Sequence, residues 1–256
     1  MTTPPRILAI AGSDSSGGAG IQADIKTITM LGGYAMTAIT AITAQNTLGV
    51  SAVEVLSPEL VAAQIDACVS DIGVDAIKIG MLGSVEIANV VADRIEALNV
   101  PVVFDPVMVA TSGAILADAE TIAAFERLMR RATLTTPNVA ELAALGGHEA
   151  MAARGIAYLA KGGDAEGDAV TDVLYVPGYP PDEGTAQRIH TRHTHGTGCT
   201  LSSAIAVALA AQIYPLWEAV TIGRMFVRRA IEAAPGFGSG NGPLGHAAAR
   251  PQTSSS

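Results

Sequence analysis

Short apolar runs of strand-forming residues alternate along the chain with longer stretches in which apolar side chains recur at helical spacing. The short runs are Ile7–Ala11, Met36–Thr43, Ala76–Ile79, Val102–Asp105 and Ile156–Ala160, and the helical stretches include Ile21–Leu31, Pro58–Asp71 and Ser84–Leu98. Because a helix between two strands lets both strands run in the same direction, this alternation predicts a mostly parallel sheet with helices on both faces. The predicted fold class is therefore α/β.

The order of elements changes towards the C-terminus. We expect strands at Ala169–Val176 and Ala186–Thr191, a loop at Tyr179–Gly184, and helices at Thr200–Gln212 and Leu216–Glu232. The two consecutive strands predict an antiparallel edge on the sheet. No linker divides the sequence, so we expect residues 1–249 to form one domain and Arg250–Ser256 to be a disordered tail.

Composition narrows the possible partners. Of the 256 residues, 49% are hydrophobic and 15% charged, and the net charge of −9 disfavours nucleic acid, which binds to clustered Lys and Arg. No apolar run reaches the ~18 residues that a membrane span needs, so we expect no membrane partner. Only Cys68 and Cys199 occur, far apart, which favours a reducing, cytoplasmic location.

A glycine-rich segment follows the first predicted strand, from Gly12 to Gly20, and its end matches the dinucleotide-binding pattern G-x-G-x-x-A. That pattern also requires an acidic residue after the next strand, which Ile39–Asn46 does not supply, so an NAD-type oxidoreductase is disfavoured. We expect a backbone loop that closes on a small polar ligand, with Asp24 one helical turn beyond it. The alternative is a glycine-rich turn without a ligand.

A second glycine-rich segment, Gly196-Thr-Gly-Cys199, precedes an apolar helix. Free N–H groups at a helix start form an anion site suited to a phosphoryl group, and Cys199 there is expected to have a lowered pKa and to act as a base. No Gly-Lys-Ser/Thr follows, so this is not a P-loop. A buried cysteine in a tight turn is the plainer alternative.

Three further polar positions follow predicted strands. Asn138 and Glu141 share one helical face, which fits either metal-nucleotide binding or a capping box. Lys161 precedes two glycines and could place a cation near nucleotide phosphates, although the segment alone indicates only a turn. Asp105 could organise Mg²⁺ through water, orient a hydroxyl, or be only a turn residue. His190, His193 and His195 are closely spaced, but we do not expect zinc because no fourth ligand is evident.

Taken together, the chain resembles the bacterial hydroxymethylpyrimidine and hydroxymethylpyrimidine-phosphate kinases of thiamine biosynthesis, a branch of the ribokinase-like superfamily. The resemblance spans nearly the whole chain. The segments that carry it are Ala11-Gly-Ser-Asp-Ser-Ser-Gly-Gly-Ala-Gly-Ile-Gln-Ala-Asp24, Ala44-Gln-Asn46, Lys78-Ile-Gly-Met81, Asp105-Pro-Val-Met108, Thr136-Pro-Asn138, Lys161-Gly-Gly163 and His195-Gly-Thr-Gly-Cys-Thr-Leu201.

The resemblance implies a three-layer sandwich and ATP-dependent phosphorylation of 4-amino-5-hydroxymethyl-2-methylpyrimidine, then of its monophosphate. It implies that Gln45 reads the aminopyrimidine edge and that Cys199 is the base, beside an anion hole formed by Gly196, Thr197 and Gly198. The other implied site residues are Gly12, Asp24, Met81 and Val107 around the pyrimidine, Lys161, Asn138 and Glu141 for the nucleotide, and Asp105 with Glu141 for Mg²⁺ held through water. A homodimer is also expected.

Two alternatives stay open: a pyridoxal-type kinase of the same superfamily, and a relative that binds ligand without turnover. The stretch between Asn138 and Lys161 is shorter than this family typically has, which leaves the support of Lys161 to be explained.

Overall fold

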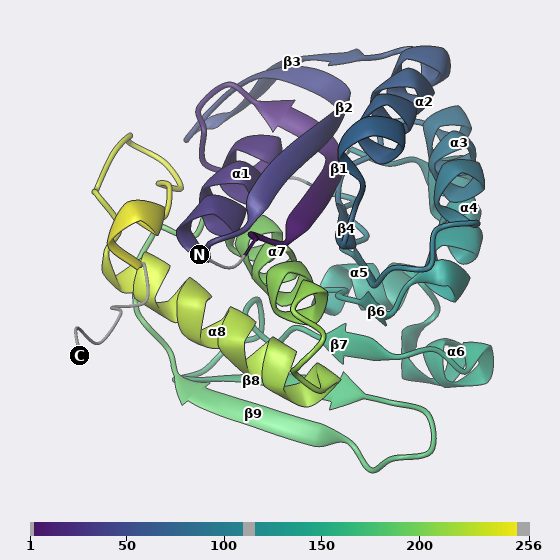
Figure 1. The fold of residues 1–256 in the computed structure, drawn as a ribbon. Helices are drawn as coiled ribbons and strands as arrows, with labels where there is room; N and C mark the ends of the chain where they lie inside the picture. Colours follow the sequence, from purple (N-terminus) through teal and green to yellow (C-terminus); the bar gives the residue numbers. More distant parts are fainter. Residues whose placement is uncertain (1–2, 110–115, 250–256) are drawn as a thin grey trace.

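The structure is a computed structural model that describes residues 3–109 and 116–249. Within these residues nine strands form one sheet in the order β3-β2-β1-β4-β5-β6-β7-β8-β9 (Figure 1). The strands are β1 (Arg6–Asp14), β2 (Tyr34–Asn46), β3 (Gly49–Val55), β4 (Ala76–Ile79), β5 (Val102–Phe104), β6 (Leu134–Thr135), β7 (Tyr158–Ala160), β8 (Ala169–Tyr175) and β9 (Asp182–Gln187). Strands β2, β1, β4, β5, β6 and β7 run parallel, and β3, β8 and β9 are antiparallel to their neighbours.

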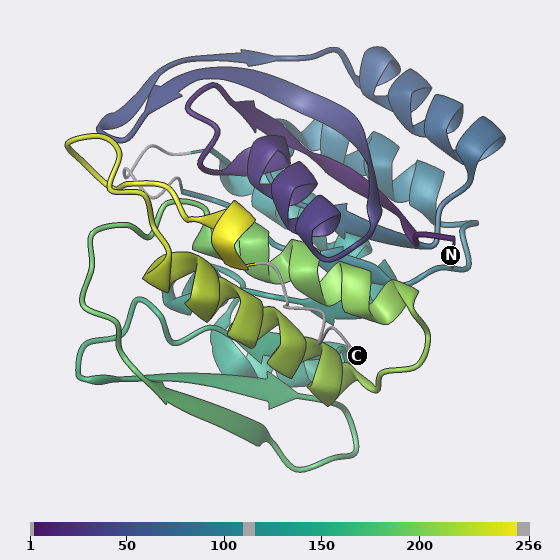
Figure 2. The same cartoon turned by 60° about the vertical axis from the view of Figure 1, so that its left-hand side comes forward.

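Helices cover both faces of this sheet, as the sequence predicts (Figure 2). The helices are α1 (Gly20–Met30), α2 (Pro58–Ala67), α3 (Val85–Ile95), α4 (Ala119–Arg131), α5 (Val139–Ala144), α6 (Gly147–Arg154), α7 (Thr197–Ala210) and α8 (Leu216–Glu232). Alternate residues of β1 separate two cores: Leu8 and Ile10 pack with α2, α3 and α4, whereas Ile7 and Ala9 pack with α1, α7 and α8. The result is a three-layer sandwich.

The helix starts follow from local side chains. Ser57 accepts a hydrogen bond from the N–H of Leu60 at the start of α2, and Ser84 does the same for Ile87 at the start of α3. Both are ordinary N-caps. Helix α7 has no side-chain cap, and it begins at Thr197, three residues earlier than the sequence pattern predicts. Residues 197–199 are therefore its first turn.

Two edge strands differ from the expectation. Strand β3 was not predicted, and β9 begins at Asp182, inside the segment expected to be a loop, and ends at Gln187. Both strands lie at an end of the sheet with mostly exposed side chains, so apolar alternation does not mark them. Arg250–Ser256, expected to be a disordered tail, lies outside the described residues. No described helix is long and apolar enough to cross a membrane.

Candidate functional site

A cavity of about 800 Å³ opens at the carboxyl ends of the parallel strands, beside the start of α7. This is where open α/β sheets bind ligands. Every site residue predicted from the sequence lines the cavity except Asp24; those that line it are Gly12, Gln45, Met81, Asp105, Val107, Asn138, Glu141, Lys161, Gly196, Thr197, Gly198 and Cys199. Residues separated by up to 187 positions therefore meet in one place.

The segment Gly196–Cys199, for which the sequence predicts a catalytic role and which is therefore called the catalytic turn, lies at the start of α7. Gly196 has φ 88°, in the left-handed region, and a Cβ there would overlap the carbonyl oxygen of Gly18. Only glycine fits that combination. A Cβ on Gly198 would lie 3.3 Å from both Asp105 Oδ2 and Lys161 Nζ. The uncapped helix start thus faces a cation and a carboxylate across a narrow gap.

The expected lowered pKa of Cys199 is wrong. Burial raises the pKa of this thiol to about 11, and the nearby Lys78 ammonium offsets the rise only in part. The position at a helix start is not enough to ionise the thiol, because desolvation penalises the thiolate more strongly. Cys199 is a neutral thiol near pH 7.

Asp105, Glu141 and Lys161 form a buried charge cluster in the cavity wall. Lys161 Nζ lies 2.7 Å from Asp105 Oδ1 and 3.8 Å from Glu141 Oε2, and Thr136 donates a hydrogen bond to Asp105. Burial raises the pKa of Glu141 to about 7, with Lys161 opposing the rise and Asp105 adding to it. For Lys161, burial lowers the pKa, but Asp105 and Glu141 reverse this and raise it above the ordinary value. Two carboxylates thus share one ammonium.

Asn138 forms the capping box that the sequence offered as an alternative. Its side chain accepts from the N–H of Glu141 at 2.8 Å, and Glu141 Oε2 accepts from the N–H of Asn138 at 2.7 Å. The box fixes the Glu141 carboxylate at the cavity wall, beside Lys161. Capping and a site role are therefore compatible, since both use one geometry.

Lys161 is well supported despite the short segment before it. Strand β7 pairs with β8, and the N–H of Gly162 donates to Asp172 Oδ1 at 2.9 Å. Arg224 of α8 donates to the other oxygen of Asp172, also at 2.9 Å. The rings of Tyr158 in β7 and Tyr175 in β8 stack across the two strands, with centroids 4.6 Å apart. These contacts, which the sequence did not reveal, hold the lysine in place.

Asp24 does not line the cavity, contrary to the expectation. Its side chain is fully buried, with Oδ1 2.9 Å and Oδ2 3.0 Å from Lys78 Nζ, and Ser203 donates to it at 2.7 Å. Helical spacing placed Asp24 on the face of α1 that packs against the sheet and α7 rather than on its end. Asp24 is the counter-ion of a buried lysine.

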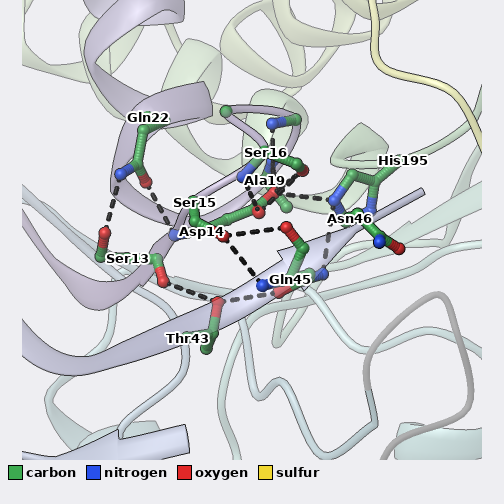
Figure 3. A network of polar contacts seen from close by, with 12 residues as sticks. Ser13, Asp14, Ser15, Ser16, Ala19, Gln22, Thr43, Gln45, Asn46 and His195 are labelled. Atoms are coloured by element: carbon green, nitrogen blue, oxygen red, sulfur yellow. Dashed lines mark hydrogen bonds and ion pairs between the residues drawn. The ribbon is translucent and has the colours of Figure 1, made fainter. Parts of the chain in front are cut away.

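Asp14 and His195, which the sequence analysis did not assign, organise the glycine-rich loop at residues 13–20 (Figure 3). The Asp14 carboxylate accepts hydrogen bonds from the backbone N–H groups of Ser16, Gly18 and Ala19, and His195 Nε2 lies 2.8 Å from its Oδ2. Burial would raise the pKa of Asp14, but the bonds from His195, Ser16 and Ala19 hold it below its usual value. In the sequence, the local pattern that could have indicated this loop is an Asp followed by a serine two residues later and a glycine four residues later.

The histidines do not converge. His190 is exposed and lies 3.5 Å from Asp168, whereas His195 is buried against Asp14. Within residues 3–109 and 116–249, no three His, Cys, Asp or Glu side chains gather in a way that could hold a metal ion. Asp105 and Glu141 are a pair, and any Mg²⁺ there would take its other ligands from water or substrate.

This fold, with its cavity beside an uncapped glycine turn and a lysine, is that of a ribokinase-like small-molecule kinase. The solved structures agree. The pyridoxal kinase of Bacillus subtilis in complex with ADP matches with TM-score 0.88 and 34% identity over 97% of this chain and 99% of that one. Phosphomethylpyrimidine kinase from Clostridium difficile matches with TM-score 0.76 and 38% identity over 89% and 99%.

The sequence comparisons decide between branches of this superfamily. The family model for phosphomethylpyrimidine kinase matches residues 14–245. The hydroxymethylpyrimidine/phosphomethylpyrimidine kinase of Rhizobium meliloti is 48% identical over 93% of this chain and 96% of its own, and that of Streptomyces coelicolor is 44% identical over 95% of each. The chain belongs to the phosphomethylpyrimidine kinase family.

Proposed function

We propose that this protein transfers the γ-phosphoryl group of ATP to 4-amino-5-hydroxymethyl-2-methylpyrimidine and then to the monophosphate so formed, in thiamine biosynthesis. Family membership supports the reaction. The structural observation that carries it is the catalytic turn, whose uncapped helix start faces Lys161 across the cavity. Phosphoryl transfer depends mainly on positioning and on charge stabilisation, and this arrangement can supply both.

The pyrimidine is proposed to lie at the end of the cavity formed by β1, β2 and the segment after β4. Gly12 leaves a flat wall there, because a Cβ at this position would lie only 2.6 Å from Met81 Cε. Gln45, Met81 and Val107 line the same end. In this arrangement Gln45 contacts the polar edge of the ring, and Met81 and Val107 contact its faces.

ATP is proposed to enter from the opposite end, with its γ-phosphate between Lys161 and the catalytic turn. Asp105 and Glu141 fit Mg²⁺ bound through water, since two buried carboxylates share one lysine and the pKa of Glu141 is raised to about 7. When bound, Mg²⁺ would neutralise phosphate charge. Asn138 fixes Glu141 for this purpose.

Cys199 is proposed to take the proton of the attacking hydroxyl. The hydroxymethyl oxygen bonds to the γ-phosphorus, the bond from phosphorus to the β-phosphate oxygen breaks, and the thiolate receives the proton. With a pKa of about 11, the thiolate fraction at pH 7 is only about one in ten thousand. For the thiolate to act as the base, substrate binding has to lower the pKa of the thiol.

A coupled ADP-release assay with the pyrimidine, pyridoxal and ribose tests the substrate. We expect ADP release with the pyrimidine. Release with pyridoxal alone would instead identify a pyridoxal-type kinase, the second candidate, whose fold this chain shares. Cys199→Ala is expected to reduce kcat far more than it changes KM, and an unchanged kcat would leave the cysteine a turn residue.

A cytoplasmic homodimer remains our proposal for the setting of the enzyme. Both cysteines are free thiols, which suits a reducing compartment. Strands β2 and β3 expose Ile42, Val53 and Val55, each with about 40% of its surface accessible, and paired subunits would cover these side chains. Light scattering of the purified protein should give twice the mass of the chain; a monomeric mass would contradict the proposal.

A further inference from the structure

The glycine-rich loop at residues 13–20 presses directly against the catalytic turn. A Cβ on Gly196 would overlap the carbonyl oxygen of Gly18, and a Cβ on Gly18 would overlap the imidazole of His195. Two segments that lie almost the length of the chain apart therefore meet without room for a side chain between them. The two segments are in direct contact, and one added methyl group would force them apart.

A buried hydrogen bond joins these segments. His195 Nε2 lies 2.8 Å from Asp14 Oδ2, and both side chains are about 96% buried. The same carboxylate oxygen accepts from the N–H groups of Gly18 and Ala19. The residue that immediately precedes the catalytic turn is thus fixed to the carboxylate around which the loop is folded.

The protonation of His195 bears on Gln45. The ionised Asp14 carboxylate can only accept, so the proton between the two residues lies on His195 Nε2. Gln45 Nε2 lies 3.4 Å from this nitrogen, which then has no lone pair to offer it (Figure 3). The amide N–H groups of Gln45 therefore remain available to a ligand in the cavity.

A third segment, at Asn241 and Gly242, also connects His195 to the end of β2. The N–H of His195 donates to Gly242 at 3.1 Å, and the N–H of Asn241 donates to the carbonyl of Thr47, two residues after Gln45. His195 thus reaches the strand end that carries Gln45 by two routes, through the Asp14 loop and through Gly242. On the first route, Ser15 Oγ donates to the carbonyl of Gln45 and accepts from its N–H, each at 2.8 Å.

We propose that the Asp14–His195 pair is a positioning device that sets the distance between Gln45 and the catalytic turn. This inference rests on the proposed function, in which Gln45 holds the pyrimidine and the turn holds the phosphoryl group. Both side chains line the cavity, but in this proposal they act through Gln45 and the turn rather than on the reacting groups. It aligns the hydroxymethyl oxygen with the phosphorus, and misplacement by about 1 Å can cost on the order of 100-fold in rate.

The test compares His195→Leu with His195→Gln, whose amide N–H can still reach Asp14. For His195→Leu we expect kcat to fall by about 10- to 100-fold and the KM of the pyrimidine to rise, while the KM of ATP changes less than about twofold. His195→Gln should recover a large part of both losses. The matched control is His190→Leu, which removes an exposed imidazole outside the cavity and should leave all three constants unchanged.

A double variant separates positioning from general destabilisation. If His195 acts through Gln45, adding Gln45→Ala to His195→Leu should raise the KM of the pyrimidine much less than Gln45→Ala does alone. Fully additive effects, or equal losses for both substrates, would overturn the proposal. If His195→Leu does not fold, Asp14→Asn takes its place in the same comparison. A wild-type protein without activity on the pyrimidine would refute the proposed function, whereas an active wild type with unaffected variants would refute only the positioning role.

Discussion

The buried ion pair between Asp24 and Lys78 gives a prediction whose size the structure sets. Asp24→Asn keeps the shape of the side chain and an acceptor for the Ser203 hydroxyl, but it removes the charge opposite Lys78, whose side chain is fully buried. Breaking a buried pair by removing one partner typically costs about 3–5 kcal/mol. Because Asp105 also favours the Lys78 charge, we expect the lower end, about 3 kcal/mol.

Urea unfolding followed by circular dichroism measures this cost, with the midpoint expected to fall at unchanged slope. In a chain of this length about 3 kcal/mol corresponds to a fall in Tm of roughly 6–12 °C. The matched control is Asp66→Asn, which breaks an ion pair with Arg94 whose side chains are about half exposed. Such pairs contribute about 0–1 kcal/mol, so the control should barely change the midpoint.

The pH dependence and a double variant test the cause. Burial lowers the pKa of Lys78, but Asp24, Cys199 and Asp105 outweigh it and raise the folded pKa above 10.5. The stabilisation that Lys78 contributes is therefore complete below pH ~10.5 and is lost as pH rises through the higher folded value. Burial raises the pKa of Asp24, so the pair also loses its charge at acid pH, when Asp24 is protonated. Replacing Lys78 by Met in the Asp24→Asn variant should restore much of the stability. A loss below about 1 kcal/mol for Asp24→Asn, or no recovery in the double variant, would refute the reasoning.

Two further predictions concern the cavity. Because the pKa of Glu141 is about 7 and only its carboxylate suits Mg²⁺, the KM of MgATP should fall as pH rises from 6 to 8. Glu141→Gln should remove this trend, and an identical trend in the variant would contradict the assignment of Glu141 to Mg²⁺. Gly196→Ala should abolish most activity, because φ is 88° and the new methyl group meets Gly18. The control is Gly49→Ala, where nothing lies within 4 Å of the added carbon. Equal kcat values for the two variants would show that the turn tolerates displacement.

The sequence predicts best those parts of the fold whose residues are buried on a regular period. Strand β4 has the predicted bounds of Ala76–Ile79, and all four of its side chains are buried. Strands β3 and β9 escape prediction because most of their side chains face solvent, and their hydrogen-bonded partners decide the conformation. The start of α7 at Thr197 is similarly hidden, because Gly196 rather than a polar cap precedes it.

For the site, sequence motifs indicate which residues gather but not what each one contacts. Asp24 lies in a conspicuous motif, yet its carboxylate faces Lys78, a partner 54 positions away. The pairing of Asp14 with His195 spans 181 positions, and nothing local to either residue reveals it. The raised pKa of Cys199 depends on burial created by the packed fold as a whole. Long-range contacts and desolvation are the quantities that the sequence leaves open.

Two helix starts, those of α1 and α7, face the same cavity, and they differ in one respect. Neither helix start has a side-chain cap, but the carboxylate of Asp14 lies beside the start of α1, where it accepts hydrogen bonds from the N–H groups of Gly18 and Ala19 just before the helix. The two helix starts therefore differ in charge. The Asp14 carboxylate offsets the positive end of the α1 dipole, whereas the positive end of the α7 dipole still attracts an anion in the cavity. A pyrimidine monophosphate would be turned by this field so that its phosphate leads towards α7, which is the orientation that a second phosphorylation requires. One internal carboxylate would thus let a single chamber accept first a neutral substrate and then a charged one without reversing either.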